Sequence, residues 1–157
     1  MTFEAVETTS DFTPNRFADA ASALAFILGG NATITLVSKK SGTRFTYKVS
    51  ANRADAAMHF VSLLRGADNE SDYSYLGRID AGGNLWIGRK VPKAGDVGRD
   101  APSALAIDYA WQHLTKRGAI PPLLEIWHEG RCGRCNRKLT VPASIASGFG
   151  PECITKL

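Results

Sequence analysis

All three cysteines of the chain lie near its C-terminal end, at a spacing that suits a metal ion. Cys132 and Cys135 form a Cys-x2-Cys pair, 17 residues separate Cys135 from Cys153, and His128 lies four positions before Cys132. Three thiolates and one imidazole are a complete tetrahedral ligand set for structural zinc. We therefore expect one structural zinc ion per chain on these residues, with Gly133 taking the positive φ that the turn between the first two cysteines needs.

The same residues have other interpretations. An odd number of cysteines disfavours a disulfide framework, and we expect no secretory leader in the opening residues MTFEAVETTSDF. A redox pair would be expected beside a βαβ pattern, whereas a basic segment and Pro142 follow Cys135. Redox-active or free thiols are the alternative to zinc. The alternatives to His128 as fourth ligand are His113, a water molecule and Glu152.

The segments around the cysteines indicate a small hairpin and helix. Residues 124–128 and 137–141 each resemble a strand, so they are expected to pair around the Cys-x2-Cys turn. Residues 142–147 predict one or two helical turns that end at Gly148. Cys153 is expected in the first turn of a terminal helix, where the helix dipole favours a thiolate. This order is typical of a treble-clef-like zinc module.

The run H-E-G-R-C-G-R-C-x-R-x-L-T-x-P-x-S-I-x-x-G-x-G-P-E-C, residues 128–153, resembles the C-terminal zinc element of small uncharacterised proteins found mainly in bacteriophages and prophages. The segments 68–77 and 100–103 resemble stretches that accompany that element, so the resemblance covers roughly residues 58–153. It implies that the three cysteines and His128 are ligands. It implies no particular reaction.

Composition and charge narrow the class of protein. The chain is 44% hydrophobic and 22% charged, and its longest apolar run falls well short of the roughly 20 residues that span a bilayer. We therefore expect an intracellular, cytoplasmic protein with no membrane partner. Because no phosphate loop or dinucleotide fingerprint is present, we expect no nucleotide or small-molecule cofactor.

The excess positive charge is concentrated at the C-terminal end. Residues 1–115 contain 12 basic and 12 acidic side chains, whereas residues 116–157 contain 7 basic and 3 acidic ones. Such a cluster suits a phosphate-facing surface, although ordinary solvated surface charge gives the same pattern. The expected nucleic-acid-binding residues are Arg131, Arg134, Arg137 and Lys138.

The remaining segments predict an α+β fold. After a flexible arm over residues 1–12, Thr13 and Pro14 predict the start of a helix that ends at Gly29 and Gly30. Residues 31–50 predict a hairpin, and strands are expected at 73–79 and 85–89. Residues 54–64 fit a helix or a strand, and the resemblance favours a strand at 59–64.

A second helix is expected over residues 101–116, capped by Asp100 and ended by Gly118. Its apolar side chains, Ala104, Ile107, Trp111 and Leu114, should face the sheet. The expected organisation is an α+β domain over residues 13–118, with a meander of about five strands, and a zinc module over residues 119–157.

These features support three functional hypotheses. The first is a non-catalytic, phage-type zinc protein that binds nucleic acid or a nucleic-acid-processing complex. The second is a protein-interaction or inhibitor protein, acting on a host protein, in which zinc only holds the fold. The third, a metal-dependent nuclease, would need an open metal site built from Asp68, Glu70, Asp72, His59 and His113. Tyr73, Tyr75 and Trp86 are strand residues that could also stack on bases.

Overall fold

A computed structural model describes residues 15–68 and 71–156. The expected arm over residues 1–12 and the expected helix start at Thr13 and Pro14 lie outside this part of the chain. The α+β class is confirmed: helices pack on a six-stranded antiparallel sheet of order β5-β4-β3-β2-β1-β6. The strands are β1 (Asn31–Ser38), β2 (Arg44–Ala51), β3 (His59–Leu64), β4 (Tyr73–Ile79), β5 (Leu85–Ile87) and β6 (Leu124–His128).

The sixth strand corrects the expected hairpin around the cysteines. β6 pairs with β1, with Leu36 opposite Ile126 and Ile34 opposite His128. Residues 137–141 form no strand and make only an isolated bridge between Arg131 and Lys138. β6 pairs with the sheet and not with residues 137–141, because this pairing buries Ile126 fully among other core side chains. The division of the chain near residue 118 stays a prediction, and residues 129–156, which follow β6, are called the C-terminal module below.

The first described helix, α2 (Ala20–Ile27), begins later than expected. Asp19 caps it by accepting a hydrogen bond from the Ser22 amide at 2.8 Å. Residues 15–18 are not helical: the Phe17 amide donates to the Ile126 carbonyl at 2.9 Å, so this segment pairs with β6. An acidic N-cap just before an Ala-rich stretch explains the later start.

The second long helix, α3 (Pro102–Gln112), continues into a π-helical turn, His113–Arg117, and ends at Gly118 in the left-handed region. Asp100 is not its cap, because Ala101 occupies that position and makes no side-chain cap bond. Pro102, at the first helical position, has no amide hydrogen, so one group fewer needs a hydrogen-bond partner at the start of the helix. The predicted buried face is confirmed, since Ala104, Ile107, Trp111 and Leu114 are all at most 5% exposed.

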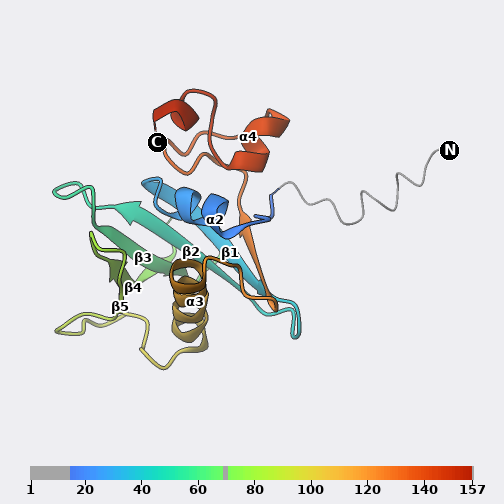
Figure 1. Cartoon of the computed structure of the whole chain (residues 1–157). Helices are drawn as coiled ribbons and strands as arrows, with labels where there is room; N and C mark the ends of the chain where they lie inside the picture. Colours follow the sequence, from blue (N-terminus) through green and yellow to red (C-terminus); the bar gives the residue numbers. More distant parts are fainter. Residues whose placement is uncertain (1–14, 69–70, 157) are drawn as a thin grey trace.

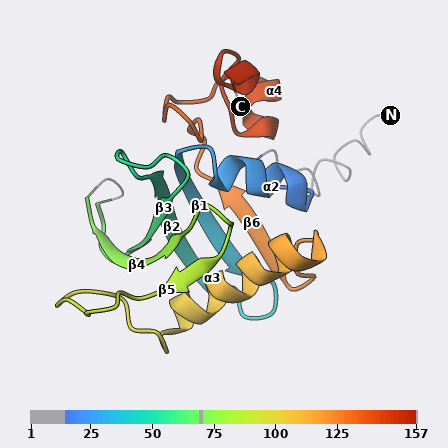
Figure 2. The ribbon, with the colours of Figure 1, turned by 60° about the vertical axis from the view of Figure 1, so that its left-hand side comes forward.

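Both helices cover the same face of the sheet, which carries Tyr47 and Ile126 and is called the inner face (Figures 1 and 2). The buried Tyr47 hydroxyl donates to the Ser103 carbonyl at 2.7 Å and so ties β2 to α3. The module, with α4 (Pro142–Ser147) and a short 3-10 helix, Cys153–Lys156, stacks beside α2 at one end of the sheet (Figure 1). Among the described residues, no helix is both long and apolar enough to cross a membrane.

Candidate metal centre

The structure brings the three cysteines together. The sulfur atoms of Cys132, Cys135 and Cys153 all lie within 4.8 Å of one another, and among residues 15–68 and 71–156 no other three His, Cys, Asp or Glu ligand atoms lie so close. Zinc–sulfur bonds of about 2.3 Å in tetrahedral geometry place sulfurs about 3.8 Å apart. Shifts of under about 1 Å would therefore let all three thiolates bind one ion. These residues form the cysteine cluster, a candidate metal site.

The turn that holds the first two cysteines differs in detail from the expected one. The Asn136 amide donates to the Cys132 carbonyl, the Cys132 amide donates to the Arg137 carbonyl, and Asn136 takes the positive φ, 66°. Gly133 does not have a positive φ. It is required for a different reason, because a Cβ at this position would lie 2.7 Å from Cδ1 of Phe26. The turn is therefore pressed against α2.

Backbone amides surround the Cys132 sulfur. The amides of Arg134 and Gly150 both donate to it at 3.4 Å. Burial raises the pKa of the Cys132 thiol, but the donated amides of Cys135, Gly150 and Arg134 outweigh burial and bring the pKa to about 7. The lowered pKa favours the Cys132 thiolate, which is the form that binds metals. The contribution of Gly150 is not evident from the spacing of the cysteines alone.

The neighbouring sulfurs make a second thiolate costly without a cation. The Arg137 amide lowers the pKa of Cys135, yet burial and the sulfurs of Cys132 and Cys153 raise it overall. The Arg134 guanidinium donates to the Cys153 sulfur at 3.6 Å. A bound divalent ion would remove the repulsion between thiolates, so this donor set fits a thiophilic metal.

His128 does not join the cysteine cluster. It lies on the inner face of β6, 2% exposed, against the rings of Phe17 and Phe26. Its Nδ1 accepts a hydrogen bond from the Gly130 amide at 3.0 Å, so its Nε2 carries the proton and donates to the Ile145 carbonyl at 2.5 Å. Both ring nitrogens thus have hydrogen-bond partners away from the cysteine cluster, and the role of His128 as fourth ligand stays a prediction.

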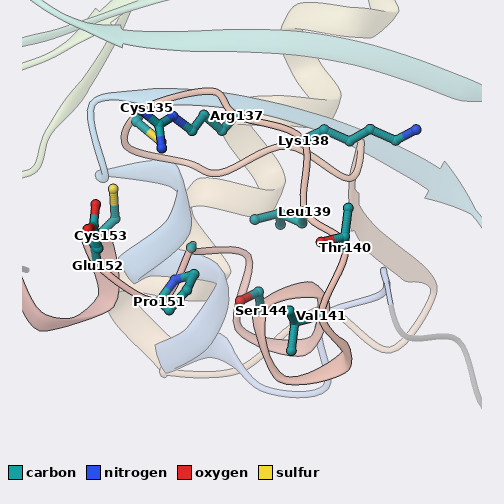
Figure 3. Close-up of a pocket in the computed structure, with 11 residues that line it drawn as sticks. Cys135, Arg137, Lys138, Leu139, Thr140, Val141, Ser144, Pro151, Glu152 and Cys153 are labelled. Atoms are coloured by element: carbon teal, nitrogen blue, oxygen red, sulfur yellow. The ribbon is translucent and has the colours of Figure 1, made fainter.

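The alternative ligands lie in different places. His113 contacts the ring of Tyr109 at the end of α3, with 4.8 Å between ring centroids. Glu152 lies beside Cys153 and, with Cys135, lines a pocket of about 260 Å³. Figure 3 shows these two cysteines at one end of the pocket and Val141 at the other. Of the protein groups considered as fourth ligand, Glu152 is the one on the wall of this pocket.

The four expected nucleic-acid-binding residues are all exposed, but they do not form one patch. Arg137 and Lys138 line the pocket beside the cysteines. Arg134 lies over Cys153. Arg131 donates to the Asn136 carbonyl and lines a separate pocket, whose other walls include residues of β1 to β4. The basic side chains therefore surround the cysteine turn on several sides.

The residues considered for a nuclease site have other surroundings. The Asp72 carboxylate accepts from the Asp68 amide at 2.8 Å, as in a loop cap, while Glu70 lies outside the described residues. His59 is buried on the inner face, with Nε2 3.3 Å from the Leu28 carbonyl. His113 is on α3's continuation, away from this loop in sequence and in contact with Tyr109.

Comparison with known protein families gives a match to the C-terminal end of the chain. Residues 127–157 match a family of unknown function, DUF6011. This segment contains the whole Cys-x2-Cys-x17-Cys arrangement, so the C-terminal module is similar to an uncharacterised family. No curated protein and no solved structure matches the chain.

Proposed function

We propose that the cysteine cluster binds one structural zinc ion and that the C-terminal module fixed in this way binds nucleic acid. The observation that carries the proposal is the position of Arg131, Arg134, Arg137 and Lys138, which are exposed on the turn that the cysteines hold. Exposed cations on a rigid turn bind phosphates at little entropic cost. The basic excess of residues 116–157 supports the same assignment.

Zinc is the metal proposed because three thiolates are soft ligands that zinc binds in structural sites. The fourth ligand in this proposal comes from the pocket side, as the Glu152 carboxylate or a water molecule. Elemental analysis of the purified protein should give one zinc per chain. Glu152→Ala should weaken zinc binding if the carboxylate is the ligand and leave it unchanged if water is, and a metal-free protein would refute the zinc proposal.

Nucleic-acid binding can be tested by charge reversal. Substituting Glu for the four basic module residues should abolish binding to a labelled oligonucleotide, because each lost phosphate contact lowers affinity and reduces its salt dependence. A matched control reverses four exposed basic residues elsewhere, Lys39, Lys40, Lys116 and Arg117, with the same change in net charge. Equal losses in both variants would mean that only net charge matters, and the module would have no special role.

A second candidate function is protein binding, and one observation favours it. The pocket beside Cys135 and Cys153 also has Leu139 and Val141 in its walls, and Val141 is 50% exposed. An apolar pocket with a basic rim suits an acidic segment of a host protein. A module that binds a protein but no nucleic acid, and whose partner is lost on Val141→Asp, would favour this alternative.

We propose, finally, that the protein acts by binding rather than by catalysis and belongs to a phage-type group working in the host cytoplasm. The resemblance of residues 58–153 to small phage and prophage proteins supports the group. Cys132, Cys135 and Cys153 form no disulfide with one another, which suits a reducing compartment. Incubation with plasmid DNA and added divalent metal tests the catalytic point, since cleavage lost on Asp72→Asn would indicate a nuclease.

A further inference from the structure

The sheet has a second face, opposite the helices, which is called the outer face. Side chains alternate along each strand, so the residues that lie between the core residues point outward here. Phe60, 38% exposed, pairs with Arg78, and Arg78 pairs with Trp86, 51% exposed. Outward residues on the strands from β2 to β5 are Arg44, Thr46, Lys48, Ser50, Phe60, Ser62, Leu64, Tyr73, Tyr75, Arg78 and Trp86.

Aromatic rings on this face are paired with cations. The Arg89 guanidinium lies 3.9 Å from the centroid of the Tyr75 ring, and that of Arg78 lies 5.4 Å from Trp86. On the next part of the face, the Lys48 ammonium lies 5.4 Å from the Tyr73 ring. Rings and guanidinium planes both present flat surfaces on which an unpaired base can stack, while the same cations attract phosphate.

The charge of this face is mainly positive where the aromatics lie. The outward residues from β2 to β5 include three cations, Arg44, Lys48 and Arg78, and no carboxylate. Three carboxylates lie nearby. Asp96 forms an ion pair with Arg89 at 2.9 Å. Asp80, which accepts from the Trp86 indole at 2.9 Å, and Glu129, which shares a pocket with Lys48 and Tyr73, each add a negative charge, fewer than the three cations. On the β6 side, Glu125 pairs with Arg16. The aromatic part of the face is thus complementary to a polyanion.

The outer face also continues into the C-terminal module. Arg131 of the module lines one pocket of about 270 Å³ together with Lys48, Tyr73 and Glu129. The Glu129 carboxylate accepts from the Thr35 hydroxyl at 2.7 Å, which ties it to β1. A chain of phosphates that leaves Arg131 would therefore meet Lys48 and the aromatic rings next.

We propose that the outer face binds an unpaired strand of nucleic acid, its bases stacking on Trp86, Phe60 and Tyr75 and its phosphates contacting Lys48, Arg78 and Arg131. This inference rests on the proposed nucleic-acid function and specifies its substrate. A duplex hides the faces of its bases inside the stack, so it gains little from exposed rings. The expected preference is for single strands over a hairpin duplex of the same sequence.

The test measures fluorescence anisotropy of a labelled single strand of about 12 nucleotides, a length within the range that one such binding surface covers. Trp86→Ala and Phe60→Ala should each weaken binding about fivefold or more, through lost stacking. Trp86→Tyr keeps a π-face and should retain most of the affinity. The matched control is Tyr109→Ala on α3, because Tyr109 is 50% exposed but lies on another surface. The affinity of this variant for the single strand should equal that of the wild-type protein.

Each other outcome has a distinct meaning. Wild-type affinity in Trp86→Ala and Phe60→Ala, with binding lost on reversal of the module charges, overturns this inference and leaves the proposed function standing. No binding of the wild-type protein to a single strand or a duplex overturns both. Self-association in sedimentation that Trp86→Ala abolishes would assign the face to a second copy of the chain, and would also overturn the inference.

Discussion

The contact between Gly133 and Phe26 predicts the effect of a single methyl group. In Gly133→Ala the new Cβ would lie 2.7 Å from Cδ1 of Phe26 and 3.1 Å from its backbone oxygen. Phe26 cannot move aside easily, because it is 1% exposed and its ring lies 5.2 Å from Phe17, 5.4 Å from His128 and 5.8 Å from Phe149 between centroids. Overpacking of such a core costs about 1–3 kcal/mol.

Gly150→Ala is a matched control. Neither glycine has a positive φ, and a Cβ at Gly150 would meet nothing within 4 Å. In both variants Ala lowers the conformational entropy of the unfolded chain, which by itself contributes about 0.4–1 kcal/mol of stability. This contribution cancels when the two variants are compared. The difference in free energy of unfolding between the two variants should therefore be about 1–3 kcal/mol, with Gly133→Ala the less stable.

Urea denaturation at a fixed, saturating zinc concentration measures this difference without a change in metal linkage. Phe26→Leu supplies a second check, since a smaller side chain should relieve the clash and make the double variant less destabilised than the sum of the single ones. Equal stabilities for Gly133→Ala and Gly150→Ala would refute the close docking of the module on α2.

Three further predictions concern single residues. Cys153→Ser should lose zinc, whereas His128→Asn should retain it; equal zinc loss in both would return His128 to the ligand set. Tyr47→Phe removes the hydroxyl that donates to the Ser103 carbonyl and should cost about 0.5–1.5 kcal/mol of stability in urea, whereas Tyr109→Phe, half exposed, should cost almost nothing. Burial lowers the pKa of His128, against the Ile145 hydrogen bond and the charge of Glu129. The unfolded chain therefore takes up this proton first, so stability is complete above about pH 6.5 and falls below it by at most about 1.4 kcal/mol per pH unit, a slope that His128→Asn should lack in urea titrations at several pH values.

The sequence predicts this fold well where side chains alternate or recur at helical spacing. The hairpin of β1 and β2 and the buried face of α3 follow from such patterns, whereas residues 54–64 fit a helix or a strand and only the resemblance favoured the strand that the structure has at 59–64. The predicted start of α2 was wrong, although the sequence contains a usable N-cap signal in Asp19 before an Ala-rich stretch. The helix was predicted to start at Pro14 because Pro is common at the first helical position. The pairing of Phe17 with β6 is a long-range contact, which no local sequence pattern contains.

The cysteine cluster could be predicted, but the role of His128 could not be read from spacing alone. The closeness of His128 to Cys132 in the sequence suggested a metal ligand. The alternation of side chains along the strand indicates better which side of the sheet His128 faces. Leu124, Ile126 and His128 alternate, so the imidazole points to the same side as the buried Ile126. That side is the core only because β6 joins β1, and this pairing depends on register between segments about 90 residues apart.

The position of His128 changes how the module is held to the rest of the protein. Its Nε2–H bonds residue 145 of α4, and its Nδ1 holds the Gly130 amide, so one imidazole fixes both the start of the module and its helix. The cysteine cluster brings together a different part, the Cys132 turn and the terminal helix at Cys153. Phe26 lies between these two attachments, against His128 on one side and Gly133 on the other. The cysteine cluster and the packing of Phe26 therefore contact the same basic turn from opposite sides.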